Sequence, residues 1–270
     1  MPPSDDQVNP GTSLSDQYIR GYRLLIQDDF GHDHLDESIW LPYYLPHWVG
    51  REASRARHRV RDGRLQLFID DDQPAWNSDV DPRMRVSSIE TGCFAGPLGS
   101  TIGQHRTHGL LRVLEEQPSI QLLTPLFGAI EIRVHWTPMP DQMVALWMIG
   151  VEDTPERSAE ICIFEIFGNE ATDADALVGC GVHPFGDPAI VDDFEKVRVG
   201  NDVSEWHDYA VVWTPHDVTF FVDGQPTKHV EQSPTYPMQL MLNIYDFGAF
   251  THGRDAPFEI ERISVLRCKH

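Results

Sequence analysis

Short apolar runs, each bounded by turn residues, recur along the chain from about residue 60 onward. Residues 64–69 follow an Asp-Gly turn at 62–63, and residues 128–136 alternate between apolar and polar side chains. An alternation with a period of two is typical of a half-buried β-strand. Residues 143–149 are continuously apolar, as expected of a strand buried on both faces. These patterns predict strands rather than helices.

The C-terminal third repeats this signal more clearly. Two β-type segments, 218–222 and 225–230, flank the dipeptide Asp223-Gly224, which is a favoured hairpin turn. Residues 238–245 and 258–266 read as two further strands, and helical periodicity is weak throughout. Many short strands without intervening helices predict an all-β sandwich or barrel.

One domain accounts for nearly all of the chain. All-β domains of this length are common, and the sequence shows neither an internal repeat nor a linker. We therefore assign residues 21–270 to a single domain and residues 1–20, which are polar and rich in Asp, Ser and Pro, to a flexible tail. Residues 70–125 are rich in Gly, Pro and Ser and are read as long loops, a kind of segment that often carries function.

The charge balance excludes several classes of binding partner. The formal net charge is −21, with 42 acidic and 21 basic residues, so we expect no binding to nucleic acid, to anionic membranes or to strongly anionic glycans. A neutral polymer is indifferent to this charge. No stretch is long and apolar enough to span a bilayer, and residues 1–18 lack the pattern of a signal peptide. The chain as given is expected to be a cytoplasmic monomer, or secreted if a leader was removed.

The cysteines are scattered, at Cys93, Cys162, Cys180 and Cys268. No pair has the CxxC spacing, which argues against a zinc site. Buried free thiols are expected in a domain large enough to fold without disulfides. Whether Cys162 pairs with Cys180 depends on strand register and stays open at this point.

Residues 159–168 carry the most informative motif, because two glutamates lie on an otherwise apolar strand. In a regular strand Glu160 and Glu165 point to opposite faces. One extra residue in a β-bulge would return Glu165 to the face of Glu160. Retaining glycosidases need two such carboxylates roughly 5 Å apart. The alternative, a solvated strand face, is disfavoured by the apolar neighbours, since carboxylates on a mostly buried strand need a reason.

The sequence Glu160-Ile-Cys-Ile-Phe-Glu165 resembles the signature of glycoside hydrolase family 16, in which an aspartate stands where Cys162 does. Segments 126–133, 144–148, 206–224 and 240–245 are similar to further family blocks in the same order, so the resemblance covers most of residues 22–267. It implies a concanavalin A-like jelly-roll, that is, an antiparallel β-sandwich of two sheets.

The resemblance also implies roles for individual residues. Glu160 would be the nucleophile and Glu165 the general acid/base, with Cys162 between them. The substrate side would include Trp147, His183, Asn243 and Tyr245. A core aromatic for Trp147 and a structural role for His183 are equally compatible with the sequence. No cofactor is required, and a structural calcium ion is a candidate, held at Asp29, Gly63 and Glu261.

Two departures from the family pattern bear on activity. Cys162 replaces a charged aspartate by a neutral thiol, so we expect reduced activity or a pH optimum moved to lower values. Two tryptophans usual in the family are missing; Trp48 and Trp76 lie in predicted loops and are candidates to replace them.

The sequence thus predicts a glycoside hydrolase, more closely a retaining endo-glycosidase acting on a β-linked polysaccharide, with β-1,3-glucan favoured. The alternative is a non-catalytic carbohydrate-binding protein on a degenerate glycosidase scaffold. Transglycosylation would use the same residues and differ only in the acceptor.

Overall fold

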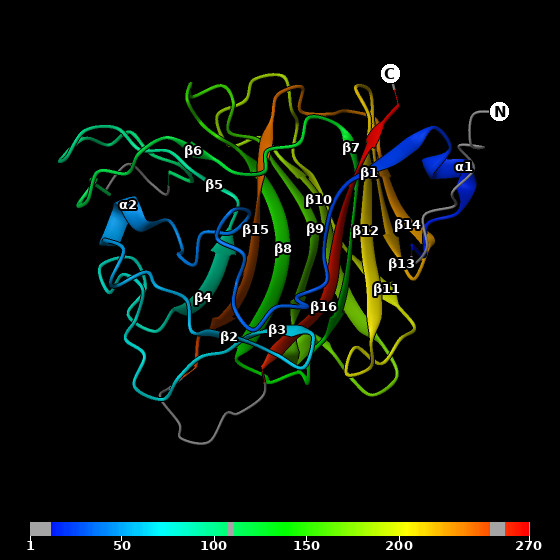
Figure 1. Ribbon diagram of the computed structural model, residues 1–270, viewed down its shortest axis with the longest axis horizontal. Helices are drawn as coiled ribbons and strands as arrows, with labels where there is room; N and C mark the ends of the chain where they lie inside the picture. The colour runs from blue at the N-terminus through cyan, green and yellow to red at the C-terminus, as the bar shows by residue number, and fades with distance from the viewer. Residues whose placement is uncertain (1–11, 107–110, 249–256, 270) are drawn as a thin grey trace.

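The computed structural model describes residues 12–106, 111–248 and 257–269. Two antiparallel sheets pack face to face and account for most of the chain, as Figure 1 shows. The prediction of an all-β, two-sheet antiparallel sandwich is confirmed. No helix in the described ranges has the length and apolar character needed to cross a membrane.

The first sheet, called here the back sheet, has the order β14-β13-β12-β7-β16-β3-β2, with β1 also paired to β16. The turn between β13 and β14 is the predicted Asp223-Gly224, where both residues have positive φ, as a tight hairpin turn requires. The strands of this sheet are β1 (Tyr22–Asp28), β2 (His58–Arg61), β3 (Arg64–Leu67), β7 (Gly128–His135), β12 (His207–Trp213), β13 (Val218–Val222), β14 (Gln225–Val230) and β16 (Phe258–Cys268).

The second sheet, called here the site sheet, has the order β11-β10-β9-β8-β15-β4. The continuous apolar run predicted to be buried on both faces lies in β8, in which every residue is buried. The strands are β4 (Arg85–Glu90), β8 (Gln142–Gly150), β9 (Glu160–Phe167), β10 (Ala176–His183), β11 (Asp193–Val199) and β15 (Met238–Asp246).

The region predicted as long loops, 70–125, contains the completely buried strand β4. Its sequence Arg-Val-Ser-Ser-Ile-Glu lacks an apolar run, because Ser87 and Ser88 are buried as hydrogen-bonding residues rather than as apolar ones. The remaining elements are short: α1 (Asp16–Ile19), α2 (Pro46–Val49), β5 (Gly92–Cys93), β6 (Ile120–Gln121) and the 3₁₀ turn η1 (Gly168–Glu170).

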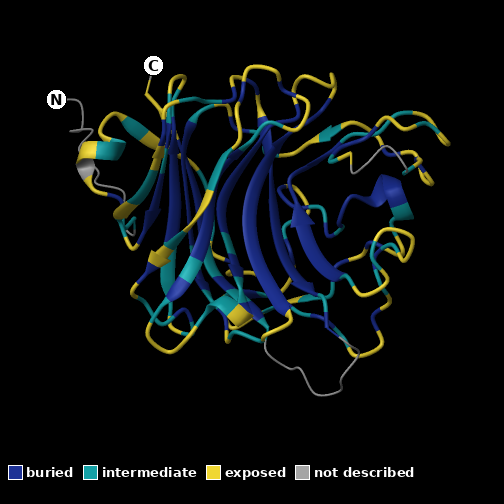
Figure 2. Cartoon of the chain, turned by 180° about the vertical axis from the view of Figure 1, so that it is seen from behind, coloured by how far each residue is buried: buried dark blue, intermediate teal, exposed yellow. Residues whose placement is uncertain are grey.

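The main core lies between the two sheets. Leu146 and Phe164 enter it from the site sheet, and Ile130 and Phe220 from the back sheet, all fully buried. In Figure 2 the central strands of both layers are accordingly dark blue. A second apolar cluster covers the opposite side of the site sheet and contains Trp147. Since both sides of this sheet are covered, a polar group on it sits in a low-dielectric environment.

Part of the segment assigned to a flexible tail contacts the sandwich. The backbone N–H and the hydroxyl of Ser13 both donate to Glu131 Oε1 at 2.6 Å. Leu14 is buried, and the ring of Tyr18 packs edge-on against Phe221 with centroids 4.6 Å apart. Residues 1–11 of the predicted tail lie outside the described residues.

The cysteine question left open by the sequence has a geometric answer. All four cysteines are free thiols, and Cys93, Cys162 and Cys180 are buried as predicted, whereas Cys268 is exposed. Cys180 belongs to the core between the sheets, whereas Cys162 belongs to the cluster on the other side of the site sheet. A disulfide between Cys162 and Cys180 is therefore excluded by the sides on which they lie.

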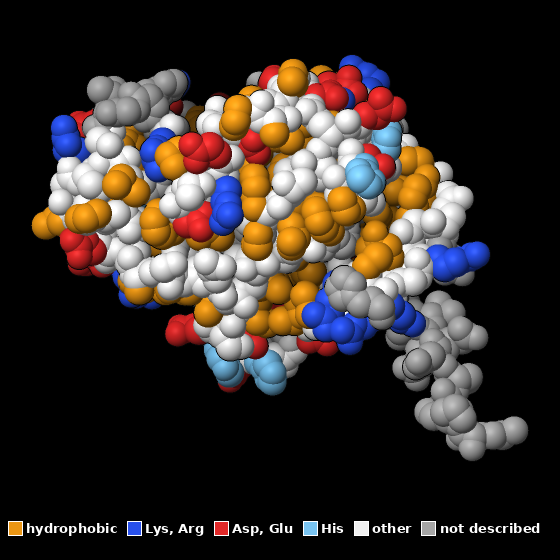
Figure 3. Space-filling model, turned by 90° about the horizontal axis from the view of Figure 1, so that it is seen from above, with side chains coloured by type: hydrophobic (Ala, Val, Ile, Leu, Met, Phe, Trp, Pro, Cys, Tyr) orange, Lys and Arg blue, Asp and Glu red, His pale blue; other side chains and the backbone are white. Residues whose placement is uncertain are grey.

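On one face of the molecule, charged side chains are distributed rather than segregated (Figure 3). On the face seen in Figure 3, acidic and basic side chains occur in small groups separated by apolar ones. The large acidic excess of the sequence is therefore not gathered into one patch on this face of the molecule.

Candidate active site

A β-bulge in β9 brings the two glutamates to one side of the site sheet. Opposite β8, Leu146 pairs with Phe164 and Trp147 with Cys162, so Ile163 is the extra residue. Ile163 and Phe164 both point into the main core, and the alternation resumes with Glu165 on the side of Cys162. The bulge predicted from the spacing is therefore present. The side that carries Trp147, Glu160, Cys162, Glu165 and Tyr245 is called the site face below.

Glycines on the neighbouring strand leave room for these carboxyls. In β10, Gly179 faces Glu165 and Gly181 faces Cys162 across the ladder. Gly181 has φ of 144°, a backbone conformation that residues with a Cβ rarely adopt, and a Cβ there would lie 2.2 Å from the Asp193 carbonyl oxygen. The glycines are thus required by the close approach of β11, and they keep the surroundings of Glu165 open.

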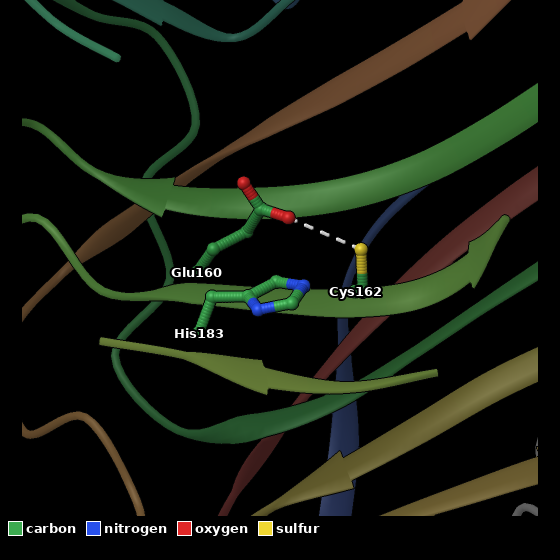
Figure 4. Close-up of side chains that lie close together, drawn as sticks. All are labelled: Glu160, Cys162 and His183. Carbon is green, nitrogen blue, oxygen red and sulfur yellow. Dashed lines mark hydrogen bonds between the residues drawn. The ribbon is translucent and has the colours of Figure 1, made fainter. Parts of the chain in front are cut away.

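Glu160 and Cys162 form the buried centre of the site. Glu160 is 5% exposed and Cys162 is fully buried. The Cys162 thiol donates to Glu160 Oε1 at 3.1 Å, as shown by the dashed line in Figure 4. Burial, and next the charge of Glu165, raise the pKa of Glu160 to about 8, whereas the thiol hydrogen bond lowers it.

Glu165 is less enclosed but titrates in the same direction. Burial raises the pKa of Glu165, opposed by hydrogen bonding to Cys162 and by the charges of His183 and Lys196. Two close carboxyls with raised pKa values cannot both ionise freely, so they titrate as a coupled pair. Coupling lets one carboxyl ionise while the other keeps its proton, which is the protonation that one acid and one nucleophile together require.

His183 stands beside this pair. It lies directly opposite Glu160 in the ladder between β9 and β10. Its Nδ1 is 2.6 Å from Asp192 Oδ1, and its ring stacks on Phe194 with centroids 4.7 Å apart. Potential ligand atoms of Glu160, Cys162 and His183 all lie within 4.8 Å of one another. Figure 4 shows the three side chains converging from the two neighbouring strands.

The other residues predicted to bind substrate, Asn243 and Tyr245, differ in their contacts at the site. Asn243 is fully buried; it accepts from the Trp147 indole N–H and donates to Ser88 Oγ at 2.6 Å. Asn243 therefore orients the Trp147 ring and does not itself face a ligand. The Tyr245 hydroxyl donates to the Tyr44 hydroxyl at 3.2 Å on the site face.

No feature of the sequence indicated a cavity of about 300 Å³, which is lined by His105 and lies near Trp147. His105 packs against Trp147 and Phe185 at 5.2 and 5.3 Å between ring centroids. Its backbone N–H donates to Glu152, whose pKa burial raises to about 7. The lining residues are His105, Arg106, Glu152, Pro155, Ser158, Phe185 and Gly186. They come from separate loops, so no sequence spacing could have grouped them.

The two tryptophans proposed as replacements are not available for stacking on a sugar. Trp48 is 1% exposed and donates to the Gln104 carbonyl, and Trp76 is 7% exposed and donates to the Tyr44 carbonyl. Both indoles belong to the apolar cluster that covers the site sheet. Their role is therefore to build the walls of the site.

The three residues predicted to hold calcium fit the ion poorly. The Glu261 carboxylate forms an ion pair with Arg133 at 3.0 Å, and a bound dication would lie next to that guanidinium. Asp29 is exposed and accepts the Gly31 N–H at 3.2 Å. With one of its two carboxylates already neutralised, this donor set falls short of the oxygen-rich shell that calcium prefers.

Comparison with known proteins decides the family. The model of glycosyl hydrolases family 16 matches residues 123–257, which is half of the chain and includes β8, β9, β10 and β15. The chain belongs to glycosyl hydrolases family 16. The resemblance stated from the sequence is thereby confirmed, and with it the assignment to the glycoside hydrolases.

Individual relatives of this family 16 chain differ in their sequence identity to it and in how much of each chain is aligned. An endo-β-galactosidase from Clostridium perfringens that releases GlcNAcα1-4Gal is 27% identical, with a TM-score of 0.75 over 92% of this chain and 63% of that one. The catalytic domain of a laminarinase from Thermotoga petrophila RKU-1 is 16% identical, with a TM-score of 0.59 over 92% of this chain and 99% of that one.

Glucan endo-1,3-beta-glucosidase A1 from Niallia circulans is 22% identical over 280 residues, which cover 92% of this chain and 37% of the relative. The chain thus spans less than two thirds of both the glucosidase and the endo-β-galactosidase. The laminarinase, at its low identity, shares the jelly-roll fold.

Proposed function

We propose that the protein is a retaining endo-glycosidase in which Glu160 is the nucleophile and Glu165 the general acid/base. The observation that carries this proposal is the bulge in β9, which turns both carboxyls to the site face. A regular strand of the same sequence would bury one of them in the main core, where an isolated charge is strongly destabilising. The bulge therefore serves the carboxyl pair rather than the packing.

The mechanism follows from the protonation of the pair. The mechanism requires an ionised Glu160 and a protonated Glu165, whereas burial in the free protein raises the pKa of Glu160 to about 8, so substrate binding must move the proton to Glu165. Glu165 then donates it to the departing glycosidic oxygen while the Glu160 carboxylate attacks the anomeric carbon. Glu165, now ionised, then takes a proton from the water that hydrolyses the glycosyl ester on Glu160. The Cys162 thiol hydrogen-bonds Glu160 and so favours its ionised form.

For the substrate, we favour a β-galactoside-containing glycan. The endo-β-galactosidase has the higher identity and TM-score among the structures compared, 27% and 0.75 against 16% and 0.59 for the laminarinase. A β-1,3-glucan, the class predicted from the sequence, is the second candidate, favoured by the similarity to the glucan endo-1,3-beta-glucosidase. The neutral members of either class are compatible with an acidic protein.

The first experiment measures release of new reducing ends from galactan-type glycans, mucin O-glycans, laminarin and lichenan. Wild type is compared with Glu160→Ala, Glu165→Ala and the control Glu205→Gln, which alters an exposed acid on a loop before β12. We expect release by wild type and the control, and a loss of about 10²–10⁴-fold for Glu165→Ala. A carbohydrate-binding protein would release nothing from any glycan and would lose only affinity in Glu160→Ala.

Azide separates the two roles. With an aryl glycoside, azide should rescue Glu160→Ala and give a glycosyl azide of inverted configuration, because the anion enters from the vacated nucleophile side. In Glu165→Ala it should intercept the glycosyl-enzyme and give the retained configuration. The opposite pairing of variant and configuration would contradict the assignment of roles.

A further inference from the structure

The site face carries a set of potential metal ligands that combines the proposed nucleophile, Glu160, with two side chains that take no part in breaking the glycosidic bond, Cys162 and His183. Within the described residues, Glu160, Cys162 and His183 form the group of His, Cys, Asp and Glu side chains whose ligand atoms come within 4.8 Å of one another. They combine an oxygen, a sulfur and a nitrogen donor. We propose that these three side chains bind Zn²⁺, and that the bound ion blocks the nucleophile.

The distances suit a zinc ion after a small adjustment. Zinc binds thiolate at about 2.3 Å and imidazole or carboxylate at about 2.0–2.2 Å, so the donors of a tetrahedral site are roughly 3.3–3.8 Å apart. Cys162 Sγ and Glu160 Oε1 are already 3.1 Å apart. The widest separation is at most 4.8 Å, so the donors lie within about 1 Å of the spacing that a bound zinc ion imposes.

His183 is already oriented as a metal ligand. Its Nδ1 contacts Asp192 Oδ1 at 2.6 Å, which fixes the proton on Nδ1 and leaves the Nε2 lone pair free. Figure 4 shows a ring nitrogen turned toward the Cys162 thiol, and stacking on Phe194 holds the ring plane. A carboxylate behind the histidine is the common outer-shell arrangement of zinc sites, and it is an observation independent of the three ligands.

Charge and chemistry complete the site. Binding of the ion displaces the Cys162 thiol proton, and the proton that Glu160 carries when it is not ionised, to the buffer, and forms Zn–S, Zn–N and Zn–O bonds without any redox change. Ionised Glu160 and Cys162 then balance the charge of the ion. Glu165, which interacts with the thiol, or a water supplies the fourth ligand. The sulfur selects zinc over the harder magnesium and calcium.

The absence of a CxxC pair argued against a zinc site, but that pattern identifies only sites that are built on pairs of cysteines. The set found here is mixed and comes from two strands whose register brings Glu160 opposite His183. Only the inhibitory consequence rests on the proposed glycosidase activity, since the Glu160 carboxylate cannot attack an anomeric carbon while it binds a metal ion.

The test uses Co²⁺ as a spectroscopic probe of the full chain, with Zn²⁺ as competitor. We expect one equivalent of Co²⁺ to give a thiolate-to-cobalt charge-transfer band and tetrahedral visible bands, both removed by Zn²⁺. Cys162→Ser should abolish the charge-transfer band. Asp192→Asn, which changes an exposed side chain and leaves all three ligands in place, should weaken binding about 10–100-fold. Cys268→Ser, at the exposed thiol, should leave the spectrum intact.

Absence of the band in folded wild type, or its persistence in Cys162→Ser, would overturn the site. Loss of the band in Cys268→Ser would overturn it as well. The Asp192→Asn result decides the matter if Cys162→Ser does not fold. Binding is read without turnover, so a protein that binds Co²⁺ but cleaves no glycan keeps the metal site and refutes the glycosidase. Full activity at saturating Zn²⁺ would refute the inhibition.

Discussion

Replacement of Cys162 by aspartate should move the activity profile to higher pH. The thiol is neutral, fully buried and 3.1 Å from Glu160 Oε1. An aspartate there adds a negative charge beside two carboxyls whose pKa values burial already raises. A nearby like charge disfavours ionisation, so the pKa values of both glutamates rise further. Both limbs of the profile then shift upward, since both report ionisation of the pair.

The size of the shift follows from the geometry. Two charges about 4 Å apart interact with roughly 4 kcal/mol at an effective dielectric constant of about 20, which corresponds to about 3 pKa units. Because three neighbouring carboxyls share protons, the new aspartate is only partly ionised, and we expect a shift of about 1–2 units. We also expect turnover to increase on the alkaline side of the wild-type optimum, where the acid then stays protonated, and to fall on the acidic side, where Glu160 is then protonated.

The assay is the pH dependence of kcat/KM for wild type, Cys162→Asp and Cys162→Ser. The serine variant is the matched control, because it replaces the thiol by a neutral donor of similar size and should leave the profile in place. An unchanged profile and turnover in Cys162→Asp would refute this account of Cys162. A shift of the same size in Cys162→Ser would show that geometry rather than charge is responsible.

Three further predictions concern residues outside the carboxyl pair. Asn243→Ala leaves the Trp147 indole N–H without its acceptor, so it should destabilise the fold by about 1–3 kcal/mol in urea unfolding and raise KM. Asp246→Ala removes the carboxylate that lies 3.0 Å from the guanidinium of Arg85, which is 2% exposed, and should cost about 3–5 kcal/mol; a loss below 1 kcal/mol would show that the remaining contacts of Arg85, which include the Asp70 carbonyl, compensate for the lost charge. Calcium added after EDTA should leave Tm unchanged, because the Glu261 carboxylate already neutralises an arginine; a calcium-dependent rise in Tm would restore the predicted site.

Much of the fold was readable from local patterns. The alternation at 128–136 and the apolar run at 143–149 became β7 and β8, because the period of a pattern is decided by nearest neighbours along one strand. The Asp223-Gly224 turn was predicted for the same reason, since its conformation depends on two residues. Strand β4 was missed, because its buried serines are satisfied by partners far away in the sequence.

Local patterns in the sequence predicted strands such as β7 and β8, and the spacing of Glu160 and Glu165 predicted the bulge, since each depends on residue types at short spacing. Tertiary structure alone decided that Cys162 and Cys180 lie on opposite sides of the site sheet, and that Asp192 lies behind His183. It also assembled the cavity at Glu152 from separate loops. These arrangements depend on strand register and on loop packing, which join residues distant in the chain and leave no periodic trace in its sequence.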